Sequence, residues 1–186
     1  MTERLAHPEL RRRLDAADLE QLRTKVHDSL HRSGVTFGPH PFEVDPVPRV
    51  IEGDEWRELH AGIVQRVRAL EAFVVDAYGP RAIVKAGVVP GRVLSGADHY
   101  EDDLRGLRPP GGWIGVAGLD LLRAPDGRFA VVEDNLRTPS GAAYLLAARQ
   151  AVDDALGWAP PERADVREAL LAALRATLHA AVPPGV

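Results

Sequence analysis

The sequence contains no cysteine, and only two of its 23 basic residues, Lys25 and Lys85, are lysines. The lack of cysteine excludes disulfides and thiolate metal sites. No apolar run is long enough to span a bilayer, and the arginine-rich first fifteen residues are not followed by an apolar stretch, so we expect neither a membrane segment nor a signal peptide. The sequence therefore predicts a soluble, cytoplasmic protein.

A strong charge of either sign is also missing. The 23 basic and 27 acidic residues give a formal net charge of -4 and a sequence pI of about 6.0. This balance argues against nucleic acid as a partner, because binding to the phosphate backbone needs a surplus of basic side chains. With 186 residues, 45% of them apolar, the chain has enough material for a globular core.

Apolar residues recur at helical spacing in several parts of the chain. Leu22, Val26 and Leu30 lie four residues apart, and Gly34 follows as the expected helix end. Thr138 and Pro139 fit the cap and first position of a later helix. The predicted helices cover residues 15–32, 54–77, 138–157 and 162–181, and the predicted strands cover 35–37, 47–51, 113–123 and 128–134.

The last two strands are separated by an Asp-Gly pair, which favours a tight hairpin. A two-residue loop at Asp126 and Gly127 sets Asp120 directly opposite Glu133. A four-residue loop from Ala124 to Gly127 instead sets Asp120 opposite Val131, still on the same face as Glu133. Only an odd loop would separate the two carboxylates.

Asn135 shares the face of Glu133, because side chains alternate along a strand. Like charges opposed on a sheet destabilise it, whereas a cation between them reverses the sign. Two carboxylates and an amide oxygen are hard ligands that suit Mg²⁺. The alternative is that one carboxylate pairs with an arginine, either Arg123 or Arg137.

The segment after the second strand adds anion-binding groups. Arg137 supplies a guanidinium, Thr138 and Ser140 supply hydroxyls, and Gly141 lies where a helix begins with free backbone N–H groups. Together they predict a phosphate site beside the metal. The alternatives are that the hydroxyls only cap the helix and that Arg137 pairs with Asp134.

These residues carry a family resemblance. The run Glu133–Gly141 reads Glu-Asp-Asn-Leu-Arg-Thr-Pro-Ser-Gly, and with Gly118–Arg123 it resembles the metal-binding strands of the circularly permuted ATP-grasp type 2 family. The resemblance covers about residues 34–150. Shorter similar stretches are Gly34–Phe37, Pro48–Ile51, Gln65–Leu70, His99-Tyr100 and Pro109–Gly112. His99 could line a substrate pocket or simply be solvated.

The resemblance implies an ATP-dependent ligase that joins a carboxylate to an amine, of amino-acid or peptide-like type, through an acyl-phosphate. Mg²⁺ and ATP would be required, and Arg137 would be catalytic by stabilising charge on the transferring group. The implied Mg²⁺ ligands are Asp120, Glu133 and Asn135, and the implied nucleotide contacts are Thr138, Ser140 and Gly141.

Two departures from the family leave alternatives open. The family's lysine-bearing lobe follows in a much longer chain, and neither Lys25 nor Lys85 sits where its ATP lysines are expected. The chain could therefore be the front part of such a ligase, a non-catalytic remnant that binds Mg²⁺ or nucleotide as a scaffold module, or half of a split enzyme whose second lobe is on another chain.

The predicted fold class is α+β, an ATP-grasp-like lobe with an antiparallel sheet flanked by helices. The helix near Trp56 and the helix after Thr138 are expected to cover the sheet, with the first and last helices outside. The expected segments are an N-terminal helical segment (1–33), a metal- and nucleotide-binding lobe (34–157), and a C-terminal helix and tail (158–186).

Overall fold

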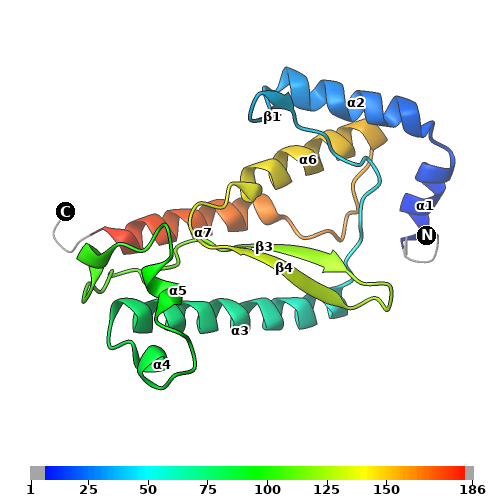
Figure 1. Ribbon diagram of the computed structural model, residues 1–186. Coiled ribbons are helices and arrows are strands. Elements are labelled where there is room, and N and C mark those ends of the chain that lie inside the picture. Colours follow the sequence, from blue (N-terminus) through cyan, green and yellow to red (C-terminus); the bar gives the residue numbers. More distant parts are fainter. Residues whose placement is uncertain (1–6, 183–186) are drawn as a thin grey trace. The chain divides into compact units, whose positions relative to one another are not determined.

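The computed structural model describes residues 7–182, so the predicted Pro183-Pro184 tail lies outside the described part (Figure 1). Two compact units divide the chain. The first contains the chain up to Trp56 together with Ser140–Leu171, and the second contains Arg57–Pro139 and the chain from Ala172 onward. The division into segments 1–33, 34–157 and 158–186 stays a prediction.

The first unit is built on two helices that are far apart in sequence. Helix α2 (Leu19–Arg32) packs along α6 (Gly141–Leu156), as Figure 1 shows. Their contact buries Val26 and Leu30 of α2 against Ala151 and Val152 of α6. A second cluster joins Leu22 to the short helix α1 (Pro8–Asp15). The spacing of four residues therefore predicts the buried face of α2 correctly.

This packing corrects the predicted arrangement of helices. Helix α2, expected outside, forms part of a core with the helix after residue 138. The expected packing of that later helix on the hairpin stays a prediction. Alanine supplies much of the apolar surface of α6, so its sequence pattern gives little information about its partner. The predicted strand at 47–51 is absent, and the described part has instead a minimal ribbon of β1 (Thr36–Phe37) and β2 (His40–Pro41).

The second unit is organised by α3 (Gly53–Tyr78), the long helix predicted at 54–77. It lies along the hairpin formed by β3 (Gly118–Arg123) and β4 (Phe129–Asn135) (Figure 1). The hairpin is shorter than predicted at its start, because residues 113–117 are not strand. The last helix, α7 (Val166–Ala181), begins in the first unit and ends in the second.

Side chains of α3 also hold the irregular segment between the helix and the hairpin. The Glu71 carboxylate accepts the backbone N–H groups of Trp113 and Ile114, each at 2.9 Å. Tyr78 stacks on Trp113 with ring centroids 4.4 Å apart. Short turns fill the segment, namely α4 (Ala82–Lys85), α5 (Arg92–Ser95) and the 3-10 turn η1 (Asp102–Leu104). The hairpin is thus reached through a connection fixed to α3.

Candidate functional site

The hairpin pairs Asp120 with Glu133, as predicted, but through a different turn. Ala124 donates to the carbonyl of Arg128 at 2.9 Å, which leaves the odd loop Pro125-Asp126-Gly127. Gly127 closes this turn by donating to the carbonyl of Ala124 at 2.8 Å, and its φ of 89° favours glycine. The loop therefore has neither the two nor the four residues considered from the sequence, and the expectation that an odd loop separates the two carboxylates is wrong.

A β-bulge restores the predicted pairing. On the turn side Leu121 pairs with Val131, whereas on the other side Asp120 pairs with Glu133, so Val132 is the extra residue. A bulge places two residues of one strand opposite one residue of its neighbour. The odd loop alone would set Asp120 opposite Val132, and the bulge shifts the pairing by one residue to Glu133.

The two faces of β4 differ in their electrostatic partners. Asp134 points to the α3 side, where Arg66 donates from Nε to Oδ1 at 2.7 Å and from Nη2 to Oδ2 at 2.6 Å. These hydrogen bonds hold the pKa of Asp134 below its ordinary value of 3.8 and raise the pKa of Arg66. The Asp134 side chain is 18% exposed.

Asp120, Glu133 and Asn135 lie on the opposite, exposed face, with Asn135 paired to Gly118. In the part of the chain that the structure describes, no hydrogen bond or ion pair engages the carboxylate of Asp120 or of Glu133. Directly opposed residues on a sheet have Cβ atoms about 5 Å apart. The structure thus brings two unpaired carboxylates and an amide together on one open face.

The predicted arginine partners are engaged elsewhere. Arg123 lies over the ring of Phe129, with Cζ 4.2 Å from the centroid, and also donates to the carbonyl of Gly127. Arg137 does not pair with Asp134, because Nη1 of Arg137 lies 3.4 Å from both ring nitrogens of His99. Charge neutralisation by either arginine therefore does not explain the two carboxylates.

A close backbone approach holds the segment after β4 near the start of β3. A Cβ atom added at Gly118 would lie 2.7 Å from Cβ of Pro139, too close for any larger residue without a shift. Thr138 precedes that proline and is exposed. Position 118 must therefore be glycine for Pro139 to lie across it.

The start of α6 differs from the prediction. The helix begins at Gly141 with Ser140 as its cap residue, and no side-chain hydrogen bond caps it. Thr138 is thus not the cap, and Pro139 is not the first helical residue. Ser140 and Gly141 belong to the first unit, whereas Arg137 and Thr138 belong to the second. The nucleotide contacts of these residues stay a prediction.

Arg66 is the residue of this region whose role was not predicted. It lies three residues after Ile63 and four before Leu70, so a charged side chain interrupts the apolar stripe of α3 on the side that faces the hairpin. This interruption of the stripe is the signal in the sequence that could have indicated a carboxylate partner on the hairpin. His99 is the second, because its contact with Arg137 cannot be deduced from a position in an irregular segment.

The hairpin face offers few protein groups that could bind a metal. No cluster of three or more His, Cys, Asp or Glu side chains that could hold a metal is found among residues 7–182. Two carboxylates and one amide fit a hard cation that takes its other ligands from water and phosphate oxygens, as Mg²⁺ does.

No helix of the described part is long and apolar enough to cross a membrane.

Residues 48–186 match the family described as Circularly permuted ATP-grasp type 2. The chain belongs to this family, and its mixed α+β architecture is that of an ATP-grasp-like lobe.

Curated relatives are considerably longer than this chain. An uncharacterized protein of Mycobacterium leprae is 41% identical over 143 residues, which cover 74% of this chain and 26% of the relative. A Frankia alni protein named "Putative glutamate--cysteine ligase 2-3" is 39% identical over 194 aligned residues, covering 99% of this chain and 21% of the relative. A Synechocystis protein, also uncharacterized, is 40% identical over 141 residues, covering 71% and 29%. The chain thus spans about a quarter of the length of the relatives it matches. Two of these relatives, from Frankia alni and Frankia casuarinae, carry names that describe them as putative glutamate--cysteine ligases.

Proposed function

We propose that the exposed face of the β3–β4 hairpin is the Mg²⁺- and phosphate-binding part of an ATP-dependent ligase that joins a carboxylate to an amine. The observation that carries this proposal is a contrast within the hairpin: Asp134 has a bidentate arginine partner, whereas the Asp120–Glu133 pair has none among residues 7–182. Opposed, unpaired carboxylates destabilise a hairpin, and a bound cation removes that cost.

In this function Asp120, Glu133 and Asn135 would hold Mg²⁺, which neutralises phosphate charge. The reaction begins when a substrate carboxylate oxygen attacks the γ-phosphorus of ATP and ADP leaves. The amine then attacks the acyl carbon of the resulting acyl-phosphate, phosphate leaves, and the amine loses a proton. Arg137 would stabilise the negative oxygens of the transferring group.

The contact between Arg137 and His99 supports that role. Arg137 lies two residues after Asn135, and among the described residues its guanidinium contacts His99 and no carboxylate that would neutralise it. Thr138, Ser140 and Gly141 would donate hydrogen bonds to phosphate oxygens from their hydroxyl or backbone N–H groups. Amino-acid or peptide-like substrates agree with the names of the two Frankia relatives, which describe them as putative glutamate--cysteine ligases.

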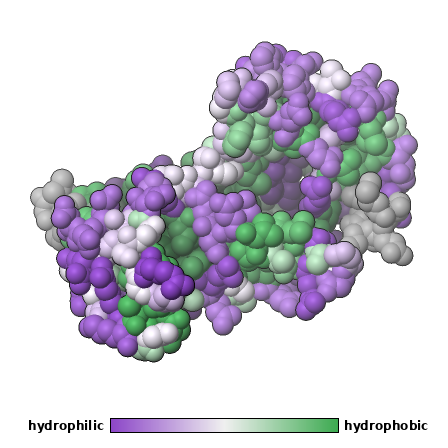
Figure 2. Space-filling model, in the orientation of Figure 1, coloured by the Kyte–Doolittle hydropathy of each residue, from purple (hydrophilic) through white to green (hydrophobic). Residues whose placement is uncertain are grey.

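A second candidate is a binding module that acts only with a lysine-bearing lobe from another chain. The exposed apolar side chains of the hairpin favour this possibility. Leu122 and Val132 are 60% and 64% exposed, and apolar surface gathers over the hairpin in Figure 2. Such side chains, beside a metal site, fit a surface that another lobe covers.

Calorimetric titration of the full chain with Mg²⁺ and with Mg-ATP tests the binding step. Glu133→Gln and Asn135→Ala should each weaken binding by at least about tenfold, whereas Asp103→Asn, a control on η1, should not. Equal binding by all variants would exclude the hairpin as the metal site. ADP release that needs both a carboxylate and an amine supports the ligase, and binding without turnover supports the module.

A further inference from the structure

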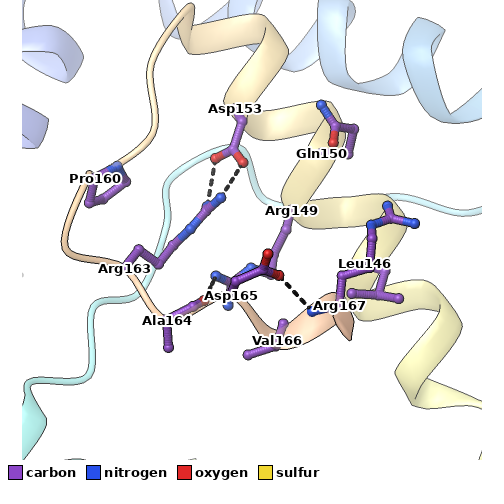
Figure 3. A pocket seen from close by; sticks show the side chains of 10 residues that line it. All are labelled: Leu146, Arg149, Gln150, Asp153, Pro160, Arg163, Ala164, Asp165, Val166 and Arg167. Atoms are coloured by element: carbon purple, nitrogen blue, oxygen red, sulfur yellow. Dashed lines mark hydrogen bonds and ion pairs between the residues drawn. The ribbon is translucent and has the colours of Figure 1, made fainter. Parts of the chain in front are cut away.

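A pocket of about 300 Å³ lies in the first unit, between α6 and the segment that leads into α7 (Figure 3). Its volume is at the lower end of the range for small-molecule sites. We call it the arginine pocket, because Arg149, Arg163 and Arg167 line it together with only two carboxylates, Asp153 and Asp165. The five charged groups therefore leave one positive charge in excess.

Both carboxylates already have partners within the pocket. Arg163 donates from Nη1 and Nη2 to the two oxygens of Asp153, at 2.8 and 2.6 Å (Figure 3). Asp165 accepts the backbone N–H of Arg167 at 2.9 Å, where α7 begins. The carboxylates thus hold the walls of the pocket together, and they do not engage the side chains of Arg149 and Arg167 in hydrogen bonds.

The remaining guanidinium donors exceed the available acceptors. Arg149 donates from Nη2 to the carbonyl of Ala164 at 3.1 Å. The Arg167 side chain has no hydrogen-bond or ion-pair partner in the described residues. A guanidinium carries five N–H donors, so most of the donors on these two residues are free.

The charge of Arg149 is also less well stabilised than in water. Burial, followed by the positive charge of Arg163, lowers the pKa of Arg149. The guanidinium groups of Arg149 on α6 and of Arg163 on the loop are therefore held near each other at an electrostatic cost. An anion placed between the arginines would reduce this cost and would accept their free donors.

We propose that the arginine pocket binds a small oxyanion, carried by a phosphate or carboxylate group of a ligand. Guanidinium groups suit both ions, because their planar donor pairs match two oxygens at once. None of the pocket residues belongs to the hairpin face, so the proposal extends beyond the ligase function. The alternative is a purely structural role, in which the Arg163–Asp153 ion pair holds the loop against α6.

The test is calorimetric titration of the full chain with inorganic phosphate and, separately, with acetate, both against chloride at constant ionic strength. Arg167→Ala removes free donors and leaves both the Arg163–Asp153 pair and the Arg149–Ala164 bond in place. We expect it to weaken oxyanion binding by about tenfold, as the loss of one charge-assisted hydrogen bond does. Arg175→Ala, which lies about two turns further along α7, is the matched control and should bind as the parent chain does.

The hairpin provides a second control. Arg137→Ala removes the arginine of the proposed ligase site, so oxyanion binding that this variant abolishes belongs to the hairpin, and binding that it keeps belongs to the arginine pocket. Tighter binding of phosphate than acetate assigns a phosphate ligand, and the reverse assigns a carboxylate. No binding of either ion, or binding that is lost in Arg137→Ala and kept in Arg167→Ala, would overturn the proposal while leaving the ligase function to stand.

Discussion

Removing one charge from the acid pair should stabilise the chain when no divalent cation is present. Asp120 and Glu133 face each other on an exposed surface, and no cationic partner for them lies in the part of the chain that the structure describes. Opposed like charges cost about 0.2 to 1 kcal/mol, and exposure places this pair in the lower part of that range. Glu133→Gln keeps the shape of the side chain and removes the repulsion. For a chain of this size, the gain corresponds to a rise in Tm of about 0.5 to 3 °C.

Mg²⁺ should reverse the order of the melting temperatures of the parent chain and Glu133→Gln. A ligand at ten times its Kd stabilises the folded state by about 1.4 kcal/mol, which exceeds the repulsion that Glu133→Gln relieves. Thermal unfolding followed by circular dichroism, in EDTA and at a series of Mg²⁺ concentrations, measures both effects. The parent chain should gain Tm with Mg²⁺, and the variant should gain little.

The neighbouring carboxylate supplies a control with the opposite sign. Asp134→Asn removes the bidentate partner of Arg66 and should lower Tm in EDTA while keeping the response to Mg²⁺. A lower melting temperature of Glu133→Gln than of the parent chain in EDTA would refute repulsion between the two acids. A full Mg²⁺ response in the variant would refute cation binding between them.

Three other perturbations have defined outcomes. Gly118→Ala should destabilise the fold by about 1–3 kcal/mol through its clash with Pro139, whereas Gly62→Ala, in open space on α3, should not; urea denaturation distinguishes the two. The pKa of Asp134 is lowered in the folded state. The contribution of Asp134 to the free energy of unfolding is therefore present well above pH 3.8 and is lost as the pH falls through the folded-state pKa. The Tm difference between parent and Asp134→Asn should therefore shrink in acid, and a constant difference would contradict this account. Leu30→Ala, at a side chain 2% exposed, should cost about 2–5 kcal/mol in urea unfolding, and a loss under 1 kcal/mol would show that its cluster is not a core.

Glu133, Asp134 and Asn135 lie on the far side of the bulge from the turn, where side chains alternate regularly, so the faces on which they lie were predictable. The pairing of Asp120 with Glu133 was reached through a wrong loop, and one bulge compensated for the error. Bulges leave little trace in a sequence, since any residue can occupy the extra position. Val132 differs in no obvious way from Val131 beside it.

The positions of the long helices were predicted well from the sequence, whereas the elements against which these helices pack were not. The apolar residues of α2 lie on one face of the helix, and the residues of α2 that are buried belong to this face. Helix α6 is rich in alanine and has weak directionality, so its packing against α2 depends on tertiary contacts that are absent from local pattern. The start of α6 was misplaced because Thr138-Pro139 has the residue types of a helix start, although the segment continues to Ser140 before the helix forms.

The extra residue in β4 makes the hairpin tolerant of a change in length. Deleting Val132 would convert the bulged ladder to a regular one and would still leave Asp120 facing Glu133, because the turn-side pairs already differ in register by one residue. Evolution can therefore add or remove a residue at this point without separating the acids. Relatives whose hairpins differ by one residue here would keep the same acid pair, and an alignment gap at position 132 would not indicate loss of the proposed metal site.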